Sequence, residues 1–363
     1  MKITKVSPYL IEATQNPCDR AFIFARVETS DGIVGWGEAY VILHRERAIV
    51  ENIKALGGML MSIPDPSPQS FVDSVINGFD SRHPSIDLSS AVSALEVALW
   101  DIRGKVEGKP VCRLLGDVIV DRVPLYANMW PTEPEPIGAL VERCIAIKDR
   151  GFRALKIYPM MYEPLAEATD CVRRVRAAIG DKMDMMIDAA VLDDSGSALA
   201  AAKAFEPFRP YWFEEPVAGE RLDAMAEIRH NTNMPIVTGE KQSGMHHFRN
   251  VLEKQAADIL NPDIVGAGGI LEILKIAALA KTHAAQVSPH CWDSMAVALA
   301  AMVHVCAVMP NALAGEYFPE YVPFCEQFAR LDLVIADGTA ALSDTPGLGV
   351  HMDEGALAAY LIK

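Results

Sequence analysis

The chain has 363 residues, enough for one large domain or two ordinary ones, and it is 51% hydrophobic and 22% charged. Its formal net charge of −15 argues against nucleic acids and anionic membranes as partners, since both attract patches of Lys and Arg. The longest apolar stretch, residues 295–309, is shorter than the roughly 20 residues of a membrane span and predicts a buried helix. Without a targeting segment or paired cysteine spacing, we expect a cytoplasmic protein.

Residues 1–122 are predicted to form a separate α+β unit. Within it, residues 21–36 predict a β-hairpin, because apolar and polar residues alternate on both sides of the turn pair Asp31-Gly32. Residues 89–103 predict a helix, because apolar side chains recur every three or four residues on one face.

From residue 123 onward, short apolar runs alternate with amphipathic helical segments. The runs are 123–130, 153–159, 184–189, 211–216, 235–240, 257–262, 285–290 and 312–318. Such alternation predicts a parallel sheet covered by helices, and the number of repeats favours a closed βα barrel over residues 123–328. The tail, residues 329–363, lacks a further βα unit, and we expect it to pack back on the N-terminal unit.

Three of these runs end in an acidic residue, at an even spacing of 26 residues: Asp188, Glu214 and Glu240. In a βα barrel the catalytic groups come from the C-terminal ends of the strands, and consecutive strands are neighbours. Three converging carboxylates stay ionised only around a cation, and ligands that are all oxygen atoms favour Mg²⁺ over Zn²⁺. For a single acid, helix capping or pairing with Lys or Arg would explain it as well, but three in register indicate one Mg²⁺ site per subunit.

Further polar residues end the other runs. Asp263 and His290 follow adjacent strands, where a carboxylate fixes the tautomer of an imidazole and raises its basicity, as for a catalytic acid/base. Lys156 and Tyr158 are two residues apart on one strand, so both face inward. Lys156 can stabilise negative charge near the metal, whereas Tyr158 either donates a proton or simply fills the barrel, and Glu316 ends the last run.

Several motifs together resemble the enolase superfamily and, within it, the mandelate racemase-like branch that includes acid-sugar dehydratases. The match extends over nearly the whole chain. Its motifs are residues 31–38 (DGIVGWGE), 94–102 (ALEVALWDI), 108–110 (GKP), 114–116 (LLG), 213–216 (FEEP) and 346–350 (PGLGV). The resemblance implies a modified (β/α) barrel with an N-terminal α+β capping domain that the C-terminal tail completes.

The resemblance also implies functional roles. It assigns Mg²⁺ to the three acids, makes Asp263–His290 the acid/base dyad, and lets Glu316 bind the substrate carboxylate or the developing enediolate. Loops of the capping domain, here about residues 14–22 and 40–50, close over the site and choose the substrate. The loop residues expected to meet its distal end are Arg20, His44, Arg45 and Arg47. Family members are commonly dimers or octamers, so a homo-oligomer is expected.

Two positions depart from the family pattern. Many relatives have a second Lys two residues after Lys156, where this chain has Tyr158, and many have Asn or His two residues after the first metal ligand, where it has Ala190. Neither position supplies a strong second base. This favours dehydration, which needs only one competent acid/base, over reactions that need a base on each face of the substrate.

We therefore expect a lyase: Mg²⁺-dependent abstraction of the proton α to a carboxylate, followed by loss of water from a sugar acid to give a 2-keto-3-deoxy acid. The alternative is an isomerase, either a sugar-acid lactone cycloisomerase or an epimerase or racemase that uses Tyr158 and His290 on opposite faces. A third hypothesis is a homologue that keeps the metal site but has lost turnover. Which sugar acid is the substrate stays open.

Overall fold

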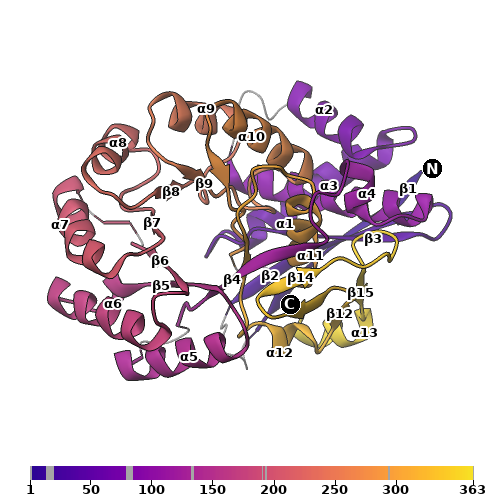
Figure 1. Ribbon diagram of the computed structural model, residues 1–363. Coiled ribbons are helices and arrows are strands. Elements are labelled where there is room, and N and C mark those ends of the chain that lie inside the picture. Colours follow the sequence, from indigo (N-terminus) through magenta and orange to yellow (C-terminus); the bar gives the residue numbers. More distant parts are fainter. Residues whose placement is uncertain are drawn as a thin grey trace.

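A computed structural model shows a cap of strands and helices beside a βα barrel (Figure 1). The structure describes residues 2–13, 20–78, 85–131, 135–189, 191–192, 194–292 and 295–362. The predicted α/β class, with a parallel-stranded barrel and an antiparallel cap, is confirmed. The limits assigned to the domains stay predictions.

The cap is a three-stranded antiparallel sheet in the order β1-β2-β3, covered by long helices. The strands are β1 (Ile3–Glu12), β2 (Ala21–Thr29) and β3 (Val34–Ala39), and the helices are α1 (Glu46–Ser62), α2 (Pro68–Gly78), α3 (Ile86–Glu107) and the short α4 (Val111–Leu115). The predicted hairpin is present as β2 and β3. The predicted helix extends at both ends, since Ser85 caps the start of α3 and Gly108 ends it in the left-handed conformation.

The barrel strands run parallel in chain order. They are β4 (Arg122–Asn128), β5 (Ala154–Ile157), β6 (Asp184–Asp188), β7 (Trp212–Glu214), β8 (Ile236–Thr238), β9 (Ile259–Leu260), β10 (Gln286–Val287) and β11 (Gly315–Tyr317). Each of the eight predicted runs contains one of them. The ring closes because β11 pairs with β4, and a parallel bridge joins Val287 of β10 to Ala312 ahead of β11.

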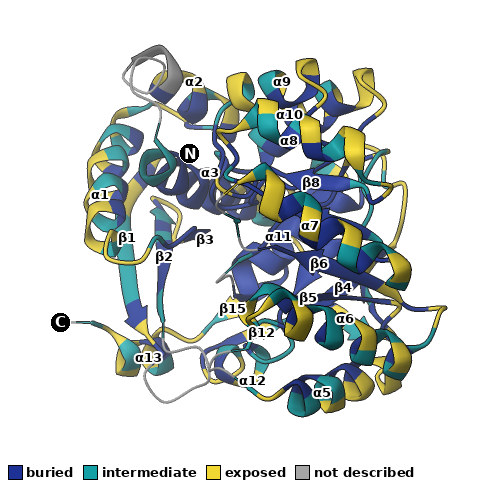
Figure 2. Ribbon diagram, turned by 90° about the vertical axis from the view of Figure 1, so that its left-hand side faces the viewer, coloured by how far each residue is buried: buried dark blue, intermediate teal, exposed yellow. Residues whose placement is uncertain are grey.

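Helices cover the outside of this ring, and burial separates the two layers (Figure 2). The helices are α5 (Ile137–Asp149), α6 (Leu165–Ile179), α7 (Ser195–Phe205), α8 (Leu222–Asn231), α9 (Met245–Glu253), α10 (Ile270–Thr282) and α11 (Ala296–Cys306). All but α11 place polar residues toward water. Every residue of α11 is buried, because the cap and the tail cover its outer side, as its mostly apolar sequence predicted.

Two buried carboxylates of the cap dock it onto barrel helices. Glu38, near the end of β3, accepts hydrogen bonds from the N–H groups of Met295 and Ala298 at 2.6 and 2.9 Å, at the N-terminus of α11. Glu96, in α3, accepts the first two N–H groups of α10 at 2.9 and 3.0 Å. A carboxylate at a helix N-terminus satisfies unpaired donors and complements the helix dipole, so these contacts fix the cap relative to the strand ends.

The tail returns across the barrel to the cap. Its elements are α12 (Val322–Cys325), β12 (Ala329–Leu331), β13 (Val334–Ala336), β14 (Thr339–Ala341), β15 (Val350–Met352) and α13 (Glu354–Leu357). Strand β14 adds to the edge of β4, and the N–H of Ile362 donates to the carbonyl of Leu10 in β1 at 2.9 Å. Among the described helices, none combines the length and apolarity that crossing a membrane requires.

Candidate active site

The three evenly spaced acids lie together at the C-terminal ends of neighbouring strands. Asp188 is paired in register with Glu214 across β6 and β7, and Glu240 follows β8 by two residues. All three are buried, with exposed fractions of 6%, 0% and 9%. The three acids therefore lie at adjacent strand ends, as their spacing predicted.

Lys156 of β5 provides positive charge inside the cluster. Its Nζ lies 2.8 Å from Glu214 Oε1, 2.9 Å from Glu316 Oε1 and 3.6 Å from Asp188 Oδ2. Burial lowers the pKa of the ammonium group, but the charges of Glu214 and Glu316 outweigh it and hold that pKa well above its usual value. Lys156 therefore stays charged and can stabilise an anion at the strand ends.

Glu214 lies at the centre of the cluster and accepts three hydrogen bonds. Besides Lys156, its donors are Asn261 Nδ2 at 2.9 Å and Trp212 Nε1 at 3.0 Å. Burial, with the neighbouring charges of Asp188 and Glu240, nevertheless raises the pKa of Glu214 to about 8, although Lys156 lowers it. A second cation faces the cluster from its other side, since Lys241 Nζ lies 2.8 Å from Glu240 Oε1.

The donor set fits a hard divalent cation. One ligand atom from each of Glu214, Glu240 and His290 lies within 4.8 Å of the others, and Asp188 adds a carboxylate beside Glu214. Two buried acceptor atoms nearby, Glu215 Oε2 and Asn261 Oδ1, have no hydrogen-bond partner among the described residues. The grouped atoms include an imidazole nitrogen of His290, which the sequence assigns to the acid/base dyad. Mg²⁺ prefers oxygen donors, so Asp188, Glu214 and Glu240 are the residues that could hold the cofactor.

The predicted dyad is formed. Asp263 and His290 are joined by a parallel bridge, and His290 Nδ1 lies 2.8 Å from Asp263 Oδ2. The other ring nitrogen, Nε2, faces the cluster, 3.1 Å from Glu240 Oε2 and 3.6 Å from Glu316 Oε2. Burial lowers the pKa of the imidazole, but the charges of Glu316 and Glu240 and the bond to Asp263 hold it well above its usual value. Nε2 is thus the ring nitrogen that can exchange a proton with a group in the site.

Tyr158 and Glu316 are linked by a residue that the sequence reasoning did not single out. Asn128, the last residue of β4, donates through Nδ2 to the Tyr158 hydroxyl and to Glu316 Oε1, both at 2.7 Å. The N–H of Cys291 donates to Glu316 Oε2 at 2.9 Å. Asn128 is the last polar residue of the run 123–130, so reading the final polar residue of that run would have found it.

An aromatic wall, formed by Tyr158, Trp130 and Trp292, borders the site. The ring centres of Tyr158 and Trp130 are 4.6 Å apart and those of Trp130 and Trp292 are 4.9 Å apart, edge to face in both pairs. Trp292 lies stacked 6.5 Å from His290, and the Arg20 guanidinium lies over Trp292 at 4.4 Å. The wall therefore extends from Tyr158 to His290, and the Arg20 cation lies against the Trp292 ring.

The remaining predicted loop residues occupy the surface of the cap. Arg45 pairs with Asp87 at the start of α3, and His44, with a positive φ of 66°, is exposed just before α1. Arg47 is also exposed. Ala190 and residues 14–19 of the first loop lie outside the described residues. The substrate-binding roles assigned to these loops stay predictions.

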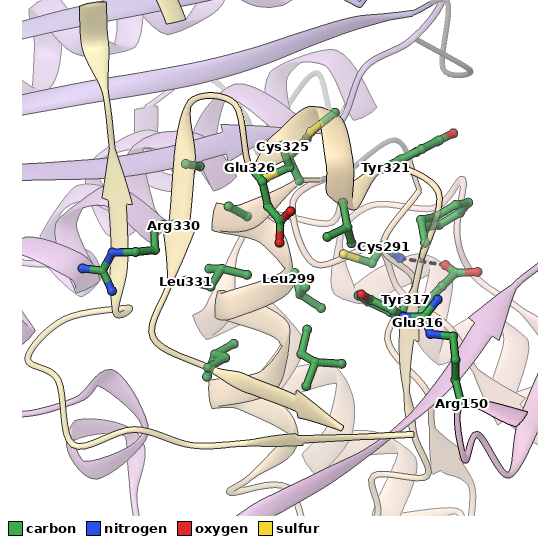
Figure 3. Close-up of a pocket in the computed structure, with 17 residues that line it drawn as sticks. Arg150, Cys291, Leu299, Glu316, Tyr317, Tyr321, Cys325, Glu326, Arg330 and Leu331 are labelled. Atoms are coloured by element: carbon green, nitrogen blue, oxygen red, sulfur yellow. Dashed lines mark hydrogen bonds between the residues drawn. The ribbon is translucent and has the colours of Figure 1, made fainter. Parts of the chain in front are cut away.

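A separate cavity of about 600 Å³ lies behind β11, between α11 and the tail (Figure 3). Cys291 and Glu316 line one end, joined by the hydrogen bond drawn there, while Leu299 and Leu331 belong to its apolar walls. Asp188, Glu214 and Glu240 do not line it. The cavity occupies the place where a regular barrel would have its eighth helix.

Comparisons of the chain with known proteins agree with this architecture. Residues 4–116 match the mandelate racemase / muconate lactonizing enzyme N-terminal domain, and residues 139–356 match the enolase C-terminal domain-like family. A D-galactonate dehydratase of Xanthomonas euvesicatoria pv. vesicatoria is 33% identical over 98% of this chain and 93% of that protein. One of Ralstonia nicotianae is 31% identical, with the same coverage of 98% and 93%.

Solved structures are similar over the full length. An enolase from the environmental genome shotgun sequencing of the Sargasso Sea is 37% identical, with a TM-score of 0.96, over 100% of this chain and 97% of that chain. The 3,6-anhydro-D-galactonate cycloisomerase of Zobellia galactanivorans is 31% identical, with a TM-score of 0.92, over 100% of both chains. The resemblance inferred from the sequence motifs is confirmed. The chain belongs to the mandelate racemase and muconate lactonizing enzyme family of the enolase superfamily.

Proposed function

We propose that this protein is a Mg²⁺-dependent hydro-lyase, which removes the proton α to the carboxylate of a sugar acid and expels the β-hydroxyl as water to leave a 2-keto-3-deoxy acid. The relatives named D-galactonate dehydratase support the predicted lyase class and a sugar acid as the substrate. The observation that carries the proposal is the Asp263–His290 pair, 2.8 Å apart, with the other ring nitrogen turned toward the carboxylate cluster, 3.1 Å from Glu240 Oε2.

Each group has a defined part in this reaction. Asp188, Glu214 and Glu240 would hold Mg²⁺, which supplies positive charge where negative charge develops on the substrate carboxylate. Lys156, 2.8 Å from Glu214, adds a fixed positive charge beside the proposed metal site. His290, oriented by Asp263, takes the α proton at Nε2.

The state of Tyr158 favours elimination over racemisation. Burial raises the pKa of its phenol well above the usual value, as do the charges of Asp188 and Glu316, while Lys156 lowers it. A phenol that stays protonated at neutral pH is a poor base, so Tyr158 does not supply a second base. A racemase or epimerase requires such a base, whereas a dehydratase does not.

A cycloisomerase is the second candidate, and the aromatic wall favours it. The flat faces of Trp130 and Trp292 suit the apolar face of a ring, and the Zobellia neighbour is named for a cyclic sugar acid. The α proton would leave to His290 in the same way. The leaving group would be a ring oxygen, which is protonated and retained in the product, so that water is not released.

The test is a turnover assay with D-galactonate, 3,6-anhydro-D-galactonate and a library of aldonates, aldarates and their lactones, each with Mg²⁺. We expect His290→Asn to lower kcat by about a thousandfold, because the principal acid/base is lost. His283→Asn, at the exposed end of α10, is the matched control and should retain activity. Near-normal turnover by His290→Asn on the true substrate would show that the assignment of His290 is wrong.

Metal binding is tested separately from activity. Mg²⁺ should raise the thermal midpoint of the wild type, since a ligand that binds only the folded state stabilises it. Glu240→Gln should weaken that response. Chelation should abolish turnover, and added Mg²⁺ should restore it. A protein that binds Mg²⁺ and sugar acids but converts none of them would instead be the non-catalytic homologue.

A further inference from the structure

Asn128 is a buried amide at the end of β4, and the proposed function assigns it no role. Its side chain is 2% exposed. It makes three hydrogen bonds of 2.7 Å, to the Tyr158 hydroxyl, to Glu316 Oε1 and to the backbone N–H of Trp130. Each of these partners borders the candidate site, so Asn128 lies at a junction of the acid cluster and the aromatic wall.

The chemistry of its partners fixes which way the amide points. The N–H of Trp130 can only donate, so the amide atom that it meets must be the oxygen, Oδ1. The nitrogen, Nδ2, then faces Glu316 and Tyr158. Lys156, at 2.9 Å from the same oxygen of Glu316, keeps that carboxylate an acceptor. Both Nδ2 protons are therefore used, one on Glu316 and one on Tyr158.

This arrangement also fixes the polarity of the Tyr158 hydroxyl. Because Asn128 Nδ2 donates to its oxygen, the phenolic proton must point elsewhere. Among the described residues, Asn128 is the hydrogen-bond partner of this hydroxyl, and an acceptor for its proton is not found. The proton is thus available to a group that enters the site. Donation from Asn128 also stabilises negative charge on the phenolic oxygen as that proton leaves.

We propose that Asn128 is a positioning residue that holds the Tyr158 hydroxyl as a proton donor to the leaving oxygen of the substrate. The proposal rests on the proposed function and deepens it, since it assigns the acid of the elimination step. Trp130 contacts Tyr158 and Trp292 contacts His290, so the two groups lie at opposite ends of the aromatic wall.

The proton inventory closes over one turnover. His290 takes the α proton, the C–H electron pair forms the carbon–carbon double bond, and the bond from the β carbon to the leaving oxygen breaks. Tyr158 gives its proton to that oxygen, which departs as water or remains as a hydroxyl if it belonged to a ring. When the enol becomes the ketone, His290 returns its proton to the β carbon and the enol proton restores Tyr158.

The test compares two rates in D₂O: exchange of the α proton in recovered substrate and formation of the keto product. The probes are D-galactonate and 3,6-anhydro-D-galactonate, followed by whichever library acid the wild type converts. Tyr158→Phe should lower product formation about a hundredfold and Asn128→Ala about tenfold. Both should raise the ratio of exchange to product, because the enediolate returns to substrate when the leaving group departs slowly. The double variant should be no slower than Tyr158→Phe.

Asn311→Ala is the matched control. Asn311 donates to the carbonyls of Ala277 and Ala285 at 3.0 and 3.2 Å near the start of β11, at the other end of the barrel. It should lower the thermal midpoint without moving the exchange-to-product ratio. If Asn128→Ala slows exchange and product formation equally, or if its effect multiplies with that of Tyr158→Phe, the positioning role is wrong. A wild type that neither exchanges nor converts any sugar acid overturns the proposed function, and this inference with it.

Discussion

A buried histidine makes the stability of the fold depend on pH. His304, in α11, is 1% exposed. Its Nδ1 accepts the N–H of Cys112 in α4 at 3.2 Å, and its Nε2 lies 3.3 Å from the carbonyl of Leu348 in the tail. Only a neutral imidazole can accept at one nitrogen and donate at the other. The ring therefore joins the cap, the barrel and the tail in its uncharged form.

The magnitude follows from the pKa. Burial lowers the pKa of His304 from 6.5 to about 4, while the hydrogen bond to Leu348 raises it slightly. The folded pKa lies below the unfolded one, so between these pH values the unfolded chain binds more protons. Stability is therefore fully present above pH 6.5 and is lost as the pH falls toward 4. At about 1.4 kcal/mol for each pKa unit, the loss is about 3 kcal/mol.

We expect His304→Phe to remove this pH dependence. The variant loses two hydrogen bonds at every pH, so its free energy of unfolding is lower at pH 7.5 by about 2 kcal/mol. Urea unfolding between pH 7.5 and pH 4 measures the difference between wild type and variant, in which the other titrating groups cancel. That difference should shrink or reverse at low pH. His230→Gln, at the exposed end of α8, is the control, and it should keep the pH dependence of the wild type. A difference that stays constant within about 1 kcal/mol would refute the reasoning.

Two further predictions concern how the cap is built, and thermal or urea unfolding tests both. A Cβ added at Gly37 of β3 would lie 1.7 Å from the carbonyl oxygen of Ala94 in α3, so Gly37→Ala should cost about 3 kcal/mol of stability. Gly58→Ala, where α1 leaves the space open, should instead stabilise by about 1 kcal/mol, and the same sign for both would contradict the packing argument. Glu96→Ala leaves the first N–H groups of α10 without their acceptor and should cost about 3 kcal/mol. Glu107→Ala, in an exposed pair on the same helix, should change stability by less than about 0.5 kcal/mol, and an equal cost for both would argue against docking by Glu96.

Periodicity predicted the barrel because parallel strands buried on both sides are short apolar runs, and each run proved to contain one strand. The C-terminal end of such a run is also the end of the barrel where side chains converge. For that reason Asp188, Glu214 and Glu240 could be placed together from their spacing, and so could Asp263 and His290. The acids that dock the cap, Glu38 and Glu96, were seen only as parts of motifs, since their partners are backbone N–H groups.

Other features depend on contacts between distant segments. Asn128 was overlooked although it ends a strand, because a lone amide has no charge to compensate and its partners, Tyr158 and Glu316, lie 30 and 188 residues away. The aromatic wall is equally remote in sequence, since Trp130 and Trp292 meet only where the barrel closes. The family motifs could be read from the sequence, but the contacts of Asn128 and of the aromatic wall could not.

By itself, the sequence determined the fold class, the strand ends that bear the acids, and the adjacency of Asp263 and His290, because each depends on local periodicity and on one register between adjacent strands. Which side chains surround these groups became clear only from the tertiary structure. It showed that Lys156 bridges Glu214 and Glu316, that Glu240 faces His290, and that Asn128 orients the Tyr158 hydroxyl. The physical reason is that the polarity of a hydrogen bond and the pKa of a buried group depend on every neighbour within a few ångströms, and barrel closure brings those neighbours from both ends of the chain.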